Sequence, residues 1–353
     1  MEDLKISKKK PSYPVSNELH KYLSEYNRNI KLPIFYDDLL RFQGSVTVYD
    51  KNDKDTLWIR VYYNEFEREE IDYSLKKIYT ILHSDGNEKT NPFLNVDAID
   101  YCTFGNSKPF RIKIRNILND NFTYFYIKKA DASRVYGLEL EHMLSPWNIH
   151  FLVYKDTLIE EHISGIPGDE FIKDMLPERT KSEKAQIAKE FIKFNERCMI
   201  RLLGDMRSYN YVIIPIHDFD QVVYKIRAID FDQQSYEGKL NIYRPQFFKE
   251  NFDMVDLVAN IIQKESLDQY VLEERSAIAK RLISYDTRMK TMLDCMMSDN
   301  ISNKNNIDLL KSQLYDYTHD LNFKRSNNMG EILFSALDFV KRNYENINTN
   351  YSA

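Results

Sequence analysis

Three aspartates and an asparagine mark the stretch of this sequence that is best suited to chemistry. Asp205 and Asn210 precede the apolar run 211–214, and Asp230 and Asp232 follow a second apolar run. Mg²⁺ is a hard ion that proteins usually hold with one or two carboxylates, together with phosphate oxygens and water. A metal and phosphate site is therefore one interpretation. The alternative is that Asp205 and Asn210 are turn residues between a helix and a strand, where both types are common.

The elements around this stretch should fix the position of its side chains. Thr180 and Glu183 form a capping-box signature that begins a helix. Apolar residues recur in that helix at steps of four, three and four, which places them on one face: Ile187, Phe191, Phe194 and Cys198. The runs 211–214 and 222–229 then form a hairpin around a polar turn. The acidic and amide side chains lie at the ends of these strands.

The two halves of the chain have different patterns. The first half predicts strands at 44–49, 56–63, 96–103, 110–114, 122–128, 151–154 and 157–163. Helices with apolar faces are predicted at 71–82 and 133–144. Beyond about residue 252 the sequence predicts helices only, at 253–263, 267–283, 287–297, 307–318 and 331–344. The expected fold class is α+β.

The acidic stretch resembles the protein-kinase-like superfamily, and most closely its aminoglycoside phosphotransferase and choline kinase branch. Gly204-Asp205, with Asn210 five positions later, is similar to the catalytic loop of that branch, which usually reads His-Gly-Asp. The run 229–232, Ile-Asp-Phe-Asp, is similar to its metal-binding turn. Leu203 stands where the family has the loop histidine, which leaves the support of the loop to other residues.

This resemblance implies a bilobal fold. Residues 96–163 would form a small lobe, with an antiparallel sheet, one helix and the hinge. Residues 164–353 would form a mainly helical lobe that carries the catalytic loop. The segment 1–95 would be an N-terminal extension or a small α/β domain.

The resemblance also implies a role for each residue of the stretch. Asp205 would accept or orient the proton of the attacking hydroxyl, and Asn210 and Asp230 would hold Mg²⁺. Asp232 would be an additional ligand or would lie in the outer shell. Arg207 would place an anionic oxygen or the transferring phosphate, and its alternative is an ordinary surface arginine.

Further matches concern the nucleotide. Lys128, at the end of a predicted strand, is similar to the lysine that holds the α- and β-phosphates, with Lys129 as the alternative. Glu139 in the following helix would pair with that lysine, because apolar residues follow it as they do in the family. Glu141, about 200° away around the helix, is the alternative.

The hinge and the phosphate-covering loop complete the resemblance. The run 157–165 is similar to the hinge strand, whose backbone groups would hydrogen-bond adenine at Glu161 and Ile163. The Pro-Gly pair at 167–168 is similar to the turn after the hinge. By position, Gly105 and Ser107 would touch phosphate, although the loop has a single glycine where the family often has several.

Composition excludes several other classes of protein. The net charge of −5 provides no broad cationic field for nucleic acid or an anionic membrane. The three cysteines show neither disulfide nor zinc spacing. No apolar run approaches the length of a membrane span, and the N-terminus lacks the apolar core of a signal peptide. We therefore expect a globular cytoplasmic protein without nucleic-acid or membrane partners.

The sequence thus predicts an ATP- and Mg²⁺-dependent phosphotransferase that moves the γ-phosphate to a hydroxyl of a small-molecule acceptor. One alternative is a pseudokinase that acts as a nucleotide-binding or protein-interaction scaffold, which the single-glycine loop and Leu203 favour. Another is a transferase that moves AMP from ATP. No Ala-Pro-Glu motif follows Asp230, which disfavours a protein kinase with a regulated activation segment.

Overall fold

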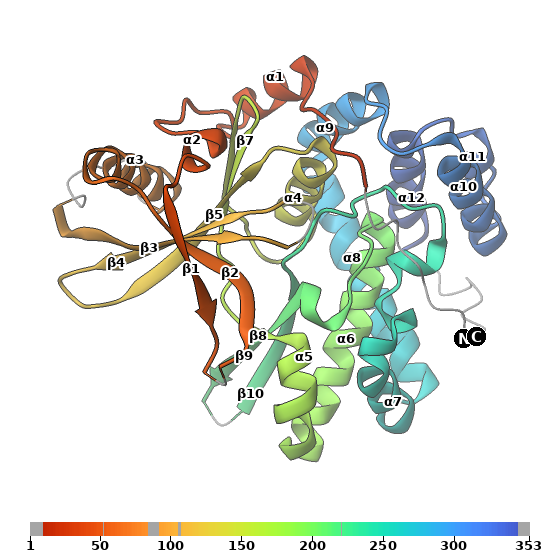
Figure 1. Ribbon diagram of the computed structural model, residues 1–353. Helices are drawn as coiled ribbons and strands as arrows, with labels where there is room; N and C mark the ends of the chain where they lie inside the picture. Colours follow the sequence, from red (N-terminus) through yellow and green to blue (C-terminus); the bar gives the residue numbers. More distant parts are fainter. Residues whose placement is uncertain (1–9, 52, 84–91, 105–106, 220, 345–353) are drawn as a thin grey trace. The chain divides into compact units, whose positions relative to one another are not determined.

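The computed structural model describes residues 10–51, 53–83, 92–104, 107–219 and 221–344. Within these ranges the chain divides into two compact units. One holds the chain up to Ala132 together with Ile149–His162, and the other holds Ser133–Asn148 and the chain from Ile163 onward. The first is built around an antiparallel sheet and the second is mainly helical, so the predicted α+β class is confirmed (Figure 1).

The sheet unit contains seven antiparallel strands in the spatial order β1-β2-β3-β4-β5-β7-β6. In chain order they are β1 (Gly44–Tyr49), β2 (Asp55–Tyr62), β3 (Leu94–Cys102), β4 (Phe110–Asn116), β5 (Phe122–Lys129), β6 (Phe151–Tyr154) and β7 (Thr157–Glu161). Side chains alternate between the two faces of a strand, and on β4 this buries Phe110, Ile112 and Ile114.

In the described part of the sheet unit there are three α-helices: α1 (Asn17–Glu25), α2 (Tyr36–Leu39) and α3 (Glu65–His83). The predicted apolar face of α3 is confirmed, because Ile71, Leu75, Ile78 and Leu82 are all buried. These side chains share one hydrophobic core with the inward residues of the strands. The helix therefore packs on the sheet and shields its apolar face.

The helical unit contains a small sheet and nine helices among the described residues. Its strands are β8 (Ile166–Pro167), β9 (Tyr211–Asp218) and β10 (Gln221–Ala228), in the order β10-β9-β8. Its helices are α4 (Ala132–Leu144), α5 (Gly168–Glu170), α6 (Lys181–Arg201), α7 (Phe252–Ile261), α8 (Lys264–Ser284), α9 (Asp286–Ser298), α10 (Lys304–Thr318), α11 (Leu321–Arg325) and α12 (Met329–Asn343).

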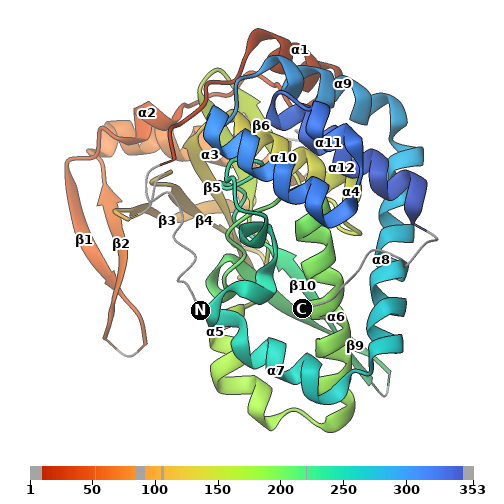
Figure 2. The ribbon, with the colours of Figure 1, turned by 90° about the vertical axis from the view of Figure 1, so that its right-hand side faces the viewer.

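Helix α6 is central to this unit. Thr180 and Glu183 form the predicted capping box at its N-terminus. The four apolar residues predicted on one face are buried, and the helix contacts β10, α7 and α8. Figure 2 shows α6 and α8 side by side. The predicted hairpin is also confirmed, with Tyr211 opposite Ala228 where β9 begins and β10 ends. The C-terminus of α6 and this end of the hairpin carry the acidic stretch.

The two compact units differ in their bounds from the three segments expected from the sequence. Residues 44–62 continue the main sheet, because β2 pairs with β3 in the register Trp58↔Cys102. Helix α4, which was expected in the sheet-rich segment, belongs to the helical unit. No helix in the described parts of the chain has the length and hydropathy that a membrane span requires.

Candidate functional site

The predicted catalytic loop follows directly from the end of α6. Leu202 terminates the helix in the left-handed conformation, with φ at 53°. Asp205 also has a positive φ, of 60°, a conformation that is uncommon for residues other than glycine. The backbone N–H of Asp205 donates to the carbonyl of Ile242 at 3.1 Å. The loop is therefore a fixed turn that gives Asp205 a specific direction.

Backbone contacts and one buried side chain support the loop. Leu203 is buried and pairs with Gln234 in an isolated β-bridge. Gly204 donates its N–H to the carbonyl of Gln233 at 3.1 Å. The fully buried Asn251 donates through Nδ2 to the carbonyl of Met206 at 2.9 Å. The 3₁₀ segment that ends at Asn251 thus takes part in holding the loop, which the sequence did not indicate.

The Asp205 carboxylate lies in a polar cluster. Arg207 donates through Nε to Asp205 Oδ1 at 2.9 Å and through Nη1 to Glu250 Oε1 at 2.7 Å. Burial raises the pKa of the Asp205 carboxyl to about 7; Arg207 opposes this rise, whereas Asp230 and Glu250 add to it. A general base works best when its pKa lies near the operating pH. Asp205 is therefore suited to exchanging a proton near neutrality.

Asn210 links the loop to the acidic turn. Its Nδ2 donates to the backbone carbonyl of Asp205 at 2.7 Å. The backbone carbonyl of Asn210 accepts a hydrogen bond at 3.0 Å from the N–H of Ile229, the residue immediately before Asp230. Asn210 is buried. Within the helical unit, Asn210 thus connects the loop at Asp205 to Ile229, the residue before Asp230.

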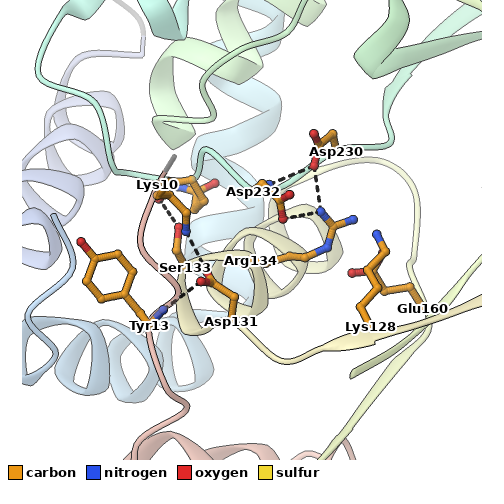
Figure 3. A network of polar contacts seen from close by, with 10 residues as sticks. Lys10, Tyr13, Lys128, Asp131, Ser133, Arg134, Glu160, Asp230 and Asp232 are labelled. Atoms are coloured by element: carbon orange, nitrogen blue, oxygen red, sulfur yellow. Dashed lines mark hydrogen bonds and ion pairs between the residues drawn. The ribbon is translucent and has the colours of Figure 1, made fainter. Parts of the chain in front are cut away.

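The acidic turn faces a cation that the sequence did not indicate. Arg134, on the first turn of α4, donates through Nη1 to Asp230 Oδ1 at 2.8 Å and to Asp232 Oδ1 at 2.7 Å (Figure 3). Only 2% of its side chain is exposed. These contacts join residues 96 and 98 positions apart in the chain. No local pattern could have revealed the pairing.

The oxygen atoms of this turn suit a hard cation. Oδ1 of Asp230 and Oδ1 of Asp232 converge on a single atom of Arg134. Asn210, which also carries an amide oxygen, is linked through its backbone carbonyl to Ile229, the residue before Asp230. Among the described residues, however, no group of three or more His, Cys, Asp or Glu side chains is arranged to hold a metal. Two carboxylates completed by phosphate oxygens and water are a common arrangement for Mg²⁺. These residues therefore fit Mg²⁺ that arrives with a nucleotide better than Mg²⁺ alone.

The pairing expected between Lys128 and Glu139 needs correction. In the sheet unit, Lys128 Nζ donates to Glu160 Oε2 at 2.8 Å, and both side chains are almost fully buried. In the helical unit, Glu139 accepts two hydrogen bonds from Arg288 Nη2, each of 2.8 Å. Lys128 and Glu160 lie on neighbouring strands, β5 and β7. Because side chains alternate between the two faces of a strand, residues 126, 128, 158 and 160 point to the same face of the sheet. This alternation was the feature of the sequence that could have identified Glu160 as the partner of Lys128.

The alternatives Lys129 and Glu141 also have partners. Lys129 Nζ lies 3.6 Å from Asp37 Oδ1, and both side chains are more than half exposed. Glu141 forms a buried ion pair with Arg201, the last residue of α6. Glu139 and Glu141 are both buried, although they lie on different sides of the helix. Helix α4 is surrounded by protein on opposite sides, so it has no solvated face at these positions.

The hinge strand has the expected form but a different hydrogen-bond pattern. The backbone N–H of Glu161 donates to the carbonyl of His150 at 3.0 Å, so this donor serves the sheet. Ile163 is buried in the helical unit. Ser107 is half-buried beside β4, and Gly105 lies outside the described residues. The predicted contacts of these four residues with a nucleotide stay predictions.

The Pro-Gly turn after the hinge lies against the catalytic loop. A methyl group in place of the Gly168 hydrogen would approach the carbonyl oxygen of Ser208 to 2.4 Å and the ring of Tyr211 to the same distance. Only glycine fits at such an approach. Gly168 therefore positions the segment 208–211, which carries Asn210.

No family model matches this sequence. No curated protein matches it either. Among solved structures, the chain is similar to ethanolamine kinase of Plasmodium vivax, with 11% sequence identity and a TM-score of 0.28. The match covers 78% of this chain and 90% of that one.

Proposed function

We propose that this protein is an ATP- and Mg²⁺-dependent phosphotransferase that moves the γ-phosphate of ATP to a hydroxyl of a small-molecule acceptor. The observation that carries the proposal is the state of Asp205. Its carboxyl lies on a fixed turn, its pKa is raised to about 7, and the acidic turn that contributes to this shift belongs to the same compact unit. Such a carboxylate can take the proton of an attacking hydroxyl.

The chemistry needs few other groups. Phosphoryl transfer asks a protein mainly to position the reactants and to stabilise charge on the phosphate oxygens. When bound, Mg²⁺ would neutralise that charge, and Asn210, Asp230 and Asp232 are the residues that would hold it. Arg207 would keep Asp205 in one orientation, since its Nε donates to the carboxylate at 2.9 Å.

A specific observation favours the scaffold as the second candidate. Arg134 already supplies a positive charge to Asp230 and Asp232. A protein that bound a nucleotide without transferring phosphate would also be compatible with this contact. Binding of Mg·ATP without turnover in the presence of acceptors would select this second candidate.

The proposal predicts that Mg·ATP stabilises the protein against heat. A ligand that binds only the folded state at 100 times its Kd adds about 2.7 kcal/mol, so the melting temperature should rise with Mg·ATP concentration. Replacing Asp230 by asparagine should reduce this rise, because one of the proposed metal ligands is lost. The measurement is differential scanning fluorimetry with Mg·ATP, with Mg²⁺ alone and with ATP in EDTA.

A matched control replaces Asp308 by asparagine. Asp308 lies on α10, and its side chain is about half exposed. It forms an ion pair with Lys311, three positions further along the same helix. D308N should keep the wild-type response to Mg·ATP. If millimolar Mg·ATP left the melting temperature of the wild-type protein unchanged, the enzyme and the nucleotide-binding scaffold would both be ruled out.

A further inference from the structure

The contact between Arg134 and the acidic turn is a built feature of the helical unit. The side chain of Arg134 is 2% exposed, whereas the side chains of Asp230 and Asp232 are 36% and 21% exposed. Figure 3 shows Arg134 reaching both carboxylates from α4. A guanidinium keeps its charge at any ordinary pH, and burying a charge is costly unless it is paired. Asp230 and Asp232 thus provide negative charge to the buried Arg134 side chain, and both of them are more exposed than it is.

Neighbouring residues of α4 hold Arg134 in this place. Ser133 donates through Oγ to the carbonyl of Gln234 at 2.7 Å. Gly137 lies so close that an added methyl group would approach Cβ of Phe231 to 3.0 Å and Cβ of Gln234 to 3.2 Å. The first turns of α4 are thus docked on residues 231–234. The docked helix therefore fixes the position of the guanidinium. An arginine on a mobile surface segment would have no such fixed position.

A metal ion and Arg134 would compete for the same oxygen atoms. Two hydrogen bonds of Arg134 start from the same nitrogen, Nη1, and each ends on the Oδ1 atom of one of the two aspartates. A divalent cation placed on these oxygens would lie within a few ångströms of a fixed positive charge that water screens poorly. Like charges at such distances repel strongly in a partly buried site. The guanidinium also offsets part of the negative charge that would attract the metal.

We propose that Arg134 is a resident counter-cation that keeps Asp230 and Asp232 from binding a divalent metal until nucleotide phosphates are present. The phosphates would supply both the negative charge that offsets Arg134 and additional oxygen ligands for the metal. The role of the nucleotide rests on the proposed function. The effect of Arg134 on metal affinity does not, and it can be measured without nucleotide.

The test is a titration with Mn²⁺ in the absence of nucleotide, followed by electron paramagnetic resonance. The wild-type protein should bind Mn²⁺ no more tightly than millimolar. R134Q should bind at least tenfold more tightly, because the charge is removed while both carboxylates remain. R134K keeps the charge and should stay weak. Adding D232N to R134Q should abolish the gain and thereby place the new site on the acidic turn.

A matched control removes another buried arginine of the same unit. Arg275 pairs with Glu196 at 2.6 Å, and both side chains are buried between α6 and α8. R275Q should lose a positive charge without gaining affinity for Mn²⁺. Urea unfolding of each variant verifies that it is folded before the titration. The wild-type titration needs no variant, so micromolar binding of Mn²⁺ by the wild-type protein would overturn the proposal even if R134Q failed to fold.

The outcomes separate this inference from the proposed function. If Mg·ATP stabilises the wild-type protein but folded R134Q binds Mn²⁺ no more tightly than wild type, the role of Arg134 is wrong and the phosphotransferase proposal stands. If R134Q gains affinity for Mn²⁺ but Mg·ATP has no effect on the wild type, Arg134 suppresses metal binding as proposed and the phosphotransferase proposal fails.

Discussion

Replacing Asp205 by asparagine is expected to lower the rate of ATP-dependent phosphoryl transfer by at least about a hundredfold, since general-base catalysis contributes about 10²–10⁴. Asparagine keeps the size of the side chain and can still accept the hydrogen bond from Arg207, but it cannot take a proton. The measurement is release of ADP in the presence of an acceptor. D308N is the control and should retain the wild-type rate.

The pH profile tests the same role independently. Only the ionised carboxylate accepts a proton, so the wild-type rate should rise with pH through about 7, where the pKa of Asp205 lies, and level off above it. Residual activity of D205N should lack this rise. An equal rate for D205N and wild type, or a wild-type rate that falls as the pH rises through 7, would contradict the role of Asp205 as the base.

Loss of activity in D205N should not come from unfolding. The folded-state pKa of Asp205 is raised above the ordinary value for aspartate, so ionisation of this carboxyl costs the folded state free energy as the pH rises above that ordinary value. Removing the ionisable group removes this cost. At pH 8 the midpoint of urea unfolding of D205N should therefore be no lower than that of the wild type.

The second large effect is expected on stability, at the ion pair between Arg201 and Glu141. The two side chains are 2% and 3% exposed, and they connect the C-terminus of α6 to α4. Breaking a buried pair leaves an uncompensated charge, which costs about 3–5 kcal/mol. R201M should lower the free energy of unfolding of the helical unit by this amount at neutral pH. With Trp58 replaced by phenylalanine, the fluorescence of Trp147 follows this unit during urea unfolding.

The pH dependence of this deficit has a definite sign. Burial would raise the pKa of Glu141, but the adjacent Arg201 outweighs it and holds the pKa below its usual value. The stabilisation by the pair is thus present above the unfolded-state pKa of glutamate, about 4.3, and is lost as the pH falls through the lower folded-state pKa. In R201M the buried carboxyl can take up a proton, so the deficit should shrink as the pH falls towards 5.

A double variant provides the control for R201M. E141Q together with R201M removes both charges, so it should recover part of the lost free energy relative to R201M alone. E141Q alone completes a double-mutant cycle, in which the loss of stability in the double variant minus the losses in the two single variants measures the coupling of the two residues. If R201M unfolded at the wild-type urea concentration, or if the double variant were less stable than R201M, the ion pair would not have the stabilising role assigned to it.

Local patterns in the sequence predicted much of the helical unit. The capping box and apolar spacing of α6 were sufficient because both arise from residues within one or two helical turns. The hairpin of β9 and β10 was predictable for the same reason, and it brings Asn210 next to Ile229. The meeting of Asp205, Asn210 and Asp230 therefore follows from short-range rules.

Contacts between distant parts of the chain were beyond such rules. The extension of the main sheet by residues 44–62 depends on the pairing of Trp58 with Cys102, and nothing in either strand specifies its partner. The contact between Arg134 and Asp230 was not predictable for a similar reason, since the docking of α4 decides which residues its first turn faces. Lys128 was expected to pair with a helical glutamate, but the neighbouring strand supplies Glu160.

Phosphorus NMR of ATP incubated with the protein, Mg²⁺ and a panel of amino alcohols, sugars and aminoglycosides tests the proposed phosphoryl transfer most directly. The proposal predicts that the γ-phosphate signal disappears, that ADP forms, and that one acceptor yields a new phosphate monoester signal, all of which D205N should prevent. Transfer of AMP with release of pyrophosphate would contradict it. So would an unchanged ATP spectrum with every acceptor.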